Sequence, residues 1–316
     1  LRIGGLSDEI ISEAMARFQK EFEENNKVDS LVDTEKKNEK WFLGPKESPE
    51  GHWSKLQGIL KTKKSWSDEM IKSLNDDSNA VISRLSDPSV KFESKTKGLV
   101  LGYVQSGKTA NYSAVISKAL DSGYKFIIVL AGIHNNLRSQ TEARLRSEIV
   151  EPSEALADPI TRSDANGDFD EKHTHNANRI LGGEKSFGIA VLKKNSSVLR
   201  KFNNWLSNAK PEIINCVSVL IIDDESDQAS INTSPRPDSE QTAINGHIRD
   251  IISRFKVVSY VGYTATPFAN ILINSGYDDD LFPRDFIVAL KKPISYIGAE
   301  ELFGAIDSEG NLKGGL

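Results

Sequence analysis

The sequence predicts an α/β fold in which a mostly parallel β-sheet is flanked by helices and preceded by an all-helical N-terminal region. Three observations support this prediction. From Lys97 onward, short apolar runs alternate with helix-forming stretches. The runs are almost continuously apolar, which is typical of strands buried on both faces. Residues 1–95 contain only helical patterns. Alternating strands and helices are joined by right-handed crossovers and form a largely parallel sheet.

The composition suits a soluble globular protein, and a single cysteine is consistent with a reducing compartment. The chain has 316 residues, of which 38% are hydrophobic and 27% charged, with a formal net charge of −5. Its longest apolar runs, 126–133 and 217–222, are too short to cross a bilayer, so we expect no membrane partner and a cytoplasmic location. The single cysteine, Cys216, lies at the edge of an apolar run, and we expect it to be buried. A protein that binds DNA over a whole face is usually basic, so any DNA contact here is expected to be local or shared with a partner.

Residues 1–95 are expected to form a helical domain packed on the sheet. Ser7 is placed to cap the first helix and Ser67 a later one. Ser78 is expected to open a last helix, which must end before Pro88. An alternative function for part of this region is an adenine pocket.

The adenine pocket would be lined by Trp53, Gln57 or Trp66, just upstream of the first strand. Purine rings stack on aromatic side chains, but a tryptophan in a protein core gives the same pattern. Both interpretations therefore stay open at this point.

The first apolar run of the sheet leads into the segment GYVQSGKTA, residues 102–110. Two glycines bracket four residues and are followed by Lys-Thr, which is the phosphate-loop pattern. Glycine is needed where backbone N–H groups wrap closely around a polyphosphate, and the next helix directs its positive end at the anion. The expected contacts to ATP are Gly102, Gln105, Ser106, Gly107, Lys108, Thr109 and Ala110. The alternative is an ordinary glycine-rich turn.

The other elements follow in a regular order. Strands are expected at 124–131, 188–192, 217–223 and 257–264, and helices at 109–120, 136–148, 198–207 and 244–255.

The stretch 151–186 interrupts this alternation because it is polar and rich in Asp, Asn and Gly, and we expect a surface insertion. His173 and His175 are possible metal ligands within it, but no Cys or acidic cluster completes a set.

A second signal is VSVLIIDDESD, in which an apolar strand ends in carboxylates. An ATP hydrolase needs one carboxylate to hold Mg²⁺ and another to polarise the attacking water. Asp224 and Glu225 suit these two roles, although Asp223 competes for the metal. The alternative is a strand that ends in solvated acids.

A third signal, Thr264-Ala265-Thr266-Pro267, ends the next strand. Thr266 is placed to cap the following helix with Pro267 at its first position, so a plain helix cap is the alternative to a functional role.

Together these segments resemble motifs I, II and III of superfamily-two helicases, which hydrolyse ATP between two RecA-like lobes. The blocks GYVQSGKTANY, LIIDDESDQASINT, GYTATPFANILI and LFPRDFIVAL are similar to the DEAD-like helicase proteins that carry a Z1 domain. Such proteins occur in bacterial restriction and phage-defence systems beside nuclease or methyltransferase subunits. The resemblance covers residues 60–304.

The resemblance implies a role for each matching residue. Lys108 would bind phosphate, Thr109 and Asp224 would hold Mg²⁺, and Glu225 would activate water. Thr264 and Thr266 would couple the nucleotide state to the grip on DNA.

It also implies DNA contacts, expected on the backbone of double-stranded DNA, after two strands of the sheet. Asn135, Asn136 and Arg138 stand where the family has motif Ia, and Lys193 and Lys194 follow the next strand. The alternative is a pair of solvated polar loops.

The resemblance divides the chain into a helical region (1–95), a RecA-like ATP-binding lobe (96–275) and the start of a Z1-like region (276–316). We find no second lobe to supply an arginine finger, a residue worth several orders of magnitude in rate. We therefore expect a fragment that binds ATP better than it hydrolyses it.

Three functions compete on this basis. The first is a DNA-dependent motor or translocase in a restriction or defence complex. The second is an ATP-switched scaffold that recruits a nuclease without moving along DNA. A small-molecule or nucleoside kinase is the third, but it leaves the second and third signals without a role.

Overall fold

The computed structural model describes residues 31–32, 41–45, 48–102, 107–164, 168–170, 174–230, 240–266, 281, 283–291, 305–306 and 312–313. The helix expected to begin at Ser7 lies outside these ranges. The helices are α2 (His52–Lys64), α3 (Asp68–Ile82), α4 (Lys108–Ser122), α5 (Asn135–Leu145), α6 (Ala177–Leu181), α7 (Ser196–Ser207), α8 (Pro211–Ile214) and α9 (Glu240–Ser253), with a π-helical turn η1 (Arg146–Val150) and a 3-10 turn η2 (Glu151–Ser153). The strands are β1 (Leu31–Val32), β2 (Ser94–Leu101), β3 (Phe126–Ala131), β4 (Ala157–Pro159), β5 (Phe187–Lys193), β6 (Ser218–Asp224), β7 (Val257–Thr264) and β8 (Phe286–Ala289), with a separate pair β9 (Ala305–Ile306) and β10 (Leu312–Lys313).

The main sheet has the order β1-β8-β2-β7-β6-β3-β5-β4. Every neighbouring pair from β8 to β4 is parallel, and the short β1 is antiparallel to β8. This mostly parallel sheet with its flanking helices confirms the predicted α/β class. Strand β7 lies between β2 and β6, so the three segments singled out in the sequence leave the sheet from adjacent strands at one edge.

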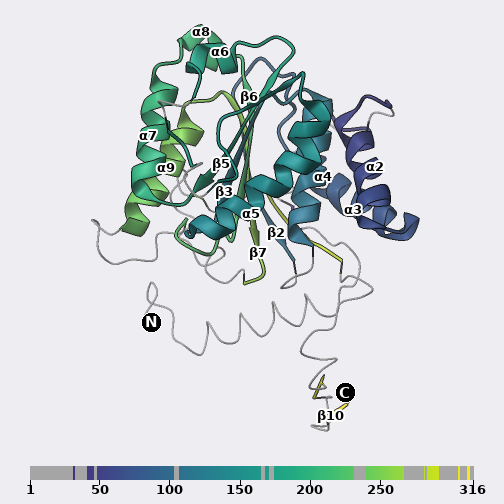
Figure 1. Ribbon diagram of the computed structural model, residues 1–316. Coiled ribbons are helices and arrows are strands. Elements are labelled where there is room, and N and C mark those ends of the chain that lie inside the picture. Colours follow the sequence, from purple (N-terminus) through teal and green to yellow (C-terminus); the bar gives the residue numbers. More distant parts are fainter. Residues whose placement is uncertain are drawn as a thin grey trace.

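Helices cover both faces of the sheet (Figure 1). Helices α7 and α9 lie on one face, and α4 with α2 and α3 lies on the other. The strand β3 shows how one sequence supplies both cores, because side chains alternate between the faces of a strand. Ile127 and Val129 join the core on the α4 face, whereas Phe126, Ile128 and Leu130 join the core with α7 and α9. None of the described helices has the length and apolar character needed to span a membrane.

The helical region upstream of β2 is confirmed in part. Ser67 caps α3, because its hydroxyl accepts a hydrogen bond from the Met70 amide (3.2 Å). The expected helix start at Ser78 is wrong, since α3 continues unbroken to Ile82 and no Gly or Pro interrupts it. The Ser78 hydroxyl donates instead to the Leu74 carbonyl (2.5 Å), one turn earlier in the same helix.

Trp53 belongs to a core rather than to an adenine pocket. Its side chain is 3% exposed and packs in a cluster between α2, α3 and α4. The Lys118 ammonium lies 4.4 Å from the centroid of its ring. Cys216, which was expected to be buried, is exposed because it lies in the turn before β6 and not within the strand.

The stretch 151–186 is not simply a surface insertion. Strand β4 pairs with β5 and forms the edge of the main sheet. Ile160, Phe169 and Ile180 are buried in the same core as α7 and α9. The few apolar residues of this polar stretch are thus enough to attach it to the sheet.

The sheet also extends beyond the expected end of the lobe at residue 275. Strand β8 pairs in parallel with β2, with Gly98 opposite Phe286. A Cβ atom on Gly98 would lie 2.1 Å from the Phe286 ring, so only glycine allows this close approach. The four residues of β8 are too short a signal to be assigned to the sheet from sequence.

Candidate nucleotide site

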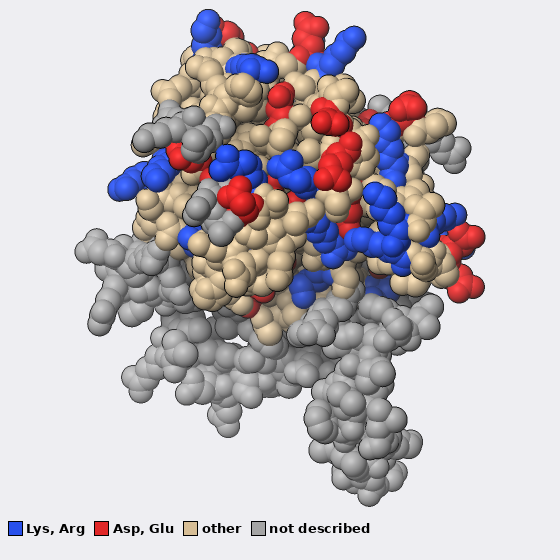
Figure 2. Space-filling view, viewed as in Figure 1, with Lys and Arg blue, Asp and Glu red and all other residues tan. Residues whose placement is uncertain are grey.

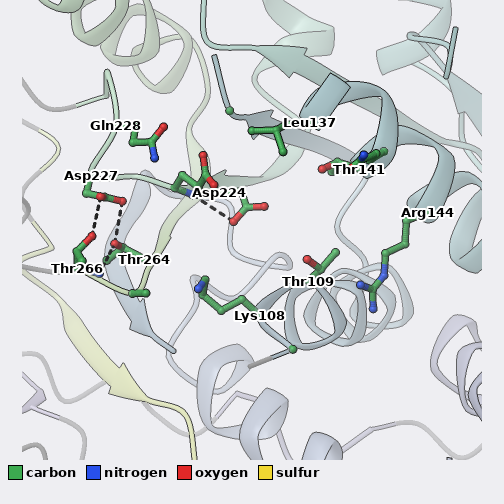
Figure 3. A pocket seen from close by; sticks show the side chains of 15 residues that line it. Lys108, Thr109, Leu137, Thr141, Arg144, Asp224, Asp227, Gln228, Thr264 and Thr266 are labelled. Carbon is green, nitrogen blue, oxygen red and sulfur yellow. Dashed lines mark hydrogen bonds between the residues drawn. The ribbon is translucent and has the colours of Figure 1, made fainter. Parts of the chain in front are cut away.

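The three predicted segments converge on one cavity of about 610 Å³ at the carboxyl edge of the sheet (Figure 3). Its described lining residues are Gly107, Lys108, Thr109, Gly132, Leu137, Gln140, Thr141, Arg144, Asp224, Glu225, Asp227, Gln228, Thr264, Ala265 and Thr266. The strand β2 ends beside β7, where the Gly102 amide donates to the Thr264 carbonyl (3.0 Å). Gln105 and Ser106 lie outside the described residues. Ala110 does not line the cavity; it packs with α2 and α3.

Gly107 explains why the phosphate loop needs glycine at its end. It precedes α4 with φ +87°, a left-handed conformation that side chains disfavour. Lys108 begins α4 and lines the cavity with Thr109, so the N-terminus of this helix, which carries a partial positive charge, lies at the cavity. Burial lowers the pKa of Lys108, and the charges of Asp224, Glu225 and Asp227 oppose this shift.

The structure shows which of two adjacent aspartates, Asp223 or Asp224, is available to bind a metal ion. Asp223 is fully buried, with the Lys194 ammonium at 2.9 Å and the Tyr260 hydroxyl donating to it at 2.5 Å. Asp224 lines the cavity, accepts from the Tyr112 hydroxyl (3.2 Å) and accepts from the Glu225 amide (3.1 Å). Asp223 is therefore occupied away from the cavity, and Asp224 is the carboxylate that faces it.

The electrostatic setting of Asp224 is mixed. Burial raises the pKa of Asp224, and the neighbouring charge of Glu225 raises it further. Lys194, Tyr112 and Lys108 act in the opposite direction. A cation bound in the cavity would, like Lys194 and Lys108, lower the pKa of Asp224 and favour its ionised form.

Glu225 is held in an unusual conformation. Its φ is +53°, in the left-handed region that is uncommon for residues other than glycine. Its Oε2 atom is buried and makes no hydrogen bond to the residues that the structure describes. That oxygen lies 3.0 Å from where a Cβ on Gly132 would be, so this glycine leaves room for the carboxylate.

Asp227 joins the second and third segments. Its two carboxylate oxygens accept from the hydroxyls of Thr264 (2.8 Å) and Thr266 (2.7 Å). The Thr266 amide in turn donates to the Thr264 hydroxyl (2.9 Å). Both threonines thus belong to a hydrogen-bonded bridge between the ends of β6 and β7. Pro267 lies outside the described residues, so the alternative of a plain helix cap stays untested.

Two of the expected DNA contacts are wrong because their side chains are buried. Arg138 is 0% exposed and donates to the carbonyls of Arg162 (2.9 Å) and Asp164 (2.7 Å). Lys194 is 2% exposed, and its ammonium also donates to the carbonyls of Asp224 (2.8 Å) and Glu225 (2.6 Å). Both cations hold loops of the lobe together.

The other three expected DNA contacts remain at the surface. Asn135 and Asn136 are exposed at the start of α5. The half-exposed Lys193 donates through its ammonium to the Asn135 side-chain oxygen (2.8 Å), which links the ends of β3 and β5. His173 lies outside the described residues and His175 contacts Arg179; no group of three or more metal-ligating side chains occurs among the described residues.

Sequence reasoning missed Tyr112 and Arg144. Tyr112 lies three residues after Thr109 on α4, so the two share a face of the helix, and this spacing was the available signal. Arg144 comes from the end of α5, and nothing in the local sequence distinguishes it from a surface arginine.

These residues fit a nucleoside triphosphate with Mg²⁺. The Thr109 hydroxyl and Asp224 carboxylate are the oxygen ligands that Mg²⁺ prefers. The unpartnered Glu225 oxygen, the open space beside Gly107 and the helix N-terminus suit a polyphosphate and its attacking water.

No family model and no curated protein matches the chain. One similar solved structure is the Hef helicase domain of Pyrococcus furiosus, with 16% sequence identity and a TM-score of 0.37 over 65% of this chain and 34% of that one. Another is Dbp5 of S. cerevisiae bound to Nup159, Gle1, IP6 and ADP, with 15% identity and a TM-score of 0.42 over 81% of this chain and 54% of that one. A third is the DEAD-box helicase Mss116 bound to single-stranded RNA and UDP-BeF (14%, 0.40, 69% and 43%). The chain therefore spans between about a third and about half of these chains.

Proposed function

We propose that this chain is the ATP-binding lobe of a DNA-dependent ATP hydrolase, a helicase-like motor or translocase that serves a restriction or phage-defence complex. One observation supports the hydrolase above all others. Lys108 and Thr109 from the phosphate loop share a cavity with Asp224 and Glu225 from the neighbouring carboxylate turn. The DNA and defence context rests on the sequence resemblance to Z1-domain proteins.

Each side chain of the site has a proposed role that follows from its chemistry. Lys108 is placed to neutralise the outer phosphates, as the lysine of a phosphate loop does. Glu225 is the candidate base, because a carboxylate with a buried, unpartnered oxygen can orient water and take its proton. Thr109 and Asp224 would hold Mg²⁺, which spreads the negative charge of the transferring phosphoryl group.

The hydrogen bonds of Asp227 to Thr264 and Thr266 could couple the state of the nucleotide to the binding of nucleic acid. Asp227 lies two residues after Glu225, and it binds Thr264, the last residue of β7, and Thr266 just after that strand. A change in the carboxylate turn after hydrolysis would therefore shift the segment that follows β7.

DNA would meet the exposed edge formed by Asn135, Asn136 and Lys193. Figure 2 shows lysine and arginine side chains interspersed with acidic ones on the face that it displays. This pattern favours a local contact to the phosphate backbone, completed by nuclease or methyltransferase subunits.

The proposal is tested by measuring ATP turnover of the full-length protein with and without duplex DNA. We expect turnover that requires Mg²⁺ and rises at least several-fold with DNA. Turnover without stimulation by DNA would reject the motor and favour an ATP-switched scaffold that recruits a nuclease. Absence of both ATP binding and turnover would reject the proposed site.

A further inference from the structure

A second cation lines the nucleotide cavity. Among the described lining residues, three carboxylates face two cationic side chains, Lys108 and Arg144. Figure 3 shows Arg144 on the far side of Thr109 from Lys108. The two cations therefore flank the place where a polyphosphate would lie on the N-terminus of α4.

Glu148 binds the Nε atom of the Arg144 guanidinium. The Arg144 Nε atom donates to Glu148 Oε1 (3.0 Å), and Glu148 is 1% exposed. The terminal nitrogens of Arg144 make no hydrogen bond to the residues that the structure describes. A guanidinium has a fork of further donors, and these suit the oxygens of a phosphate.

Glu148 is shared between two cations. Its Oε1 also accepts from the Lys64 ammonium at the end of α2, and its Oε2 is buried without a hydrogen-bond partner among the described residues. One carboxylate thus faces two positive charges, which leaves one of them uncompensated beside the cavity. Glu148 lies in the π-helical turn η1 that continues α5, and such turns often occur at functional sites.

Arg146 shows that this placement is specific. It lies two residues further along the chain, but its guanidinium contacts Glu142 (3.5 Å) and the Thr161 carbonyl (3.3 Å). It lines a different hollow, beside β4. An arginine on the same segment therefore has a structural partner and no access to the nucleotide cavity.

We propose that Arg144 contacts the polyphosphate of the bound nucleotide from within this same lobe, with Glu148 as its positioning residue. The inference rests on the proposed function and adds a residue to that site. Arg144 would supply in cis a positive charge that Lys108 alone does not provide.

The test is a calorimetric titration of the full-length protein with Mg·ATP and, separately, with magnesium tripolyphosphate. Replacing Arg144→Ala should weaken the binding of both ligands by about 10- to 100-fold, as loss of a charge-assisted hydrogen bond does. Arg144→Lys should restore part of the loss. The matched control Arg146→Ala should bind both ligands like the wild type.

Glu148 is tested by a double-mutant cycle. Glu148→Gln should weaken binding in the wild-type background and have little further effect when Arg144→Ala is already present, because a positioning residue acts through its partner. Equal losses in both backgrounds would reject the positioning role.

The outcomes separate this inference from the proposed function. Wild-type protein that binds neither ligand would reject the nucleotide site itself. Wild-type binding that Arg144→Ala leaves unchanged would reject the arginine contact and leave the site intact. A loss for ATP without a loss for tripolyphosphate would also contradict a phosphate contact.

Discussion

Lys194 is the residue on which the shape of the carboxylate turn depends. Its buried ammonium donates to the Asp223 side chain and to the carbonyls of Asp224 and Glu225. The turn therefore closes around one cation, and this closure supports the left-handed conformation of Glu225. Strain of this kind persists only where the surrounding structure over-determines it.

Replacing Lys194→Met should destabilise the protein strongly. Asp223 would keep its buried position without an ionic partner, which costs about 3–5 kcal/mol. Chemical denaturation of the variant measures this loss. The adjacent substitution Lys193→Met is the control, since that half-exposed side chain contacts Asn135 and should change stability by about 0.5 kcal/mol or less. Equal effects of the two substitutions would contradict the assigned role of Lys194.

At the scale of elements, the packing of α3 on α4 depends on a buried amine. Lys118 is fully buried on α4, and its ammonium donates to the Asn75, Ser78 and Asn79 side chains of α3. Burial lowers the pKa of Lys118 to about 7. The helix that begins at the phosphate loop is thus attached to α3 by a group that titrates near neutral pH.

This shift predicts how stability changes with pH. A lysine with a depressed pKa in the folded state binds fewer protons than in the unfolded chain between about pH 7 and its ordinary value. The free energy of unfolding should therefore rise with pH above about 7, by about 2–3 kcal/mol up to pH 9 from this group.

Denaturant titrations at several pH values measure the slope. Lys118→Met should lower stability overall and remove this part of the pH dependence, whereas Lys125→Met should leave it unchanged, because Lys125 is an outward-facing lysine that contacts the Glu184 carbonyl. A slope that survives in Lys118→Met would refute the assignment.

For the molecule as a whole, the parallel character of the sheet and the main residues of the cavity follow from patterns that lie within short segments, whereas the strand order does not. Gly107, Lys108 and Thr109 are adjacent in sequence, and the carboxylates of β6 end an apolar run, so local patterns predict them. Arg138 and Lys194 were misassigned because their partners come from distant segments, and a charged residue after a strand has the same local pattern whether buried or exposed. Arg144 was missed for the same reason.

A calorimetric titration of the full-length protein with Mg·ATP shows whether the cavity binds a triphosphate. We expect wild type and Glu225→Gln to bind Mg·ATP with similar affinity, since the amide keeps the shape of the carboxylate. Lys108→Ala should lose about 100-fold or more, because its charge-assisted contacts to phosphate are gone. Binding by Lys108→Ala at wild-type strength would contradict a triphosphate site between the phosphate loop and the carboxylate turn.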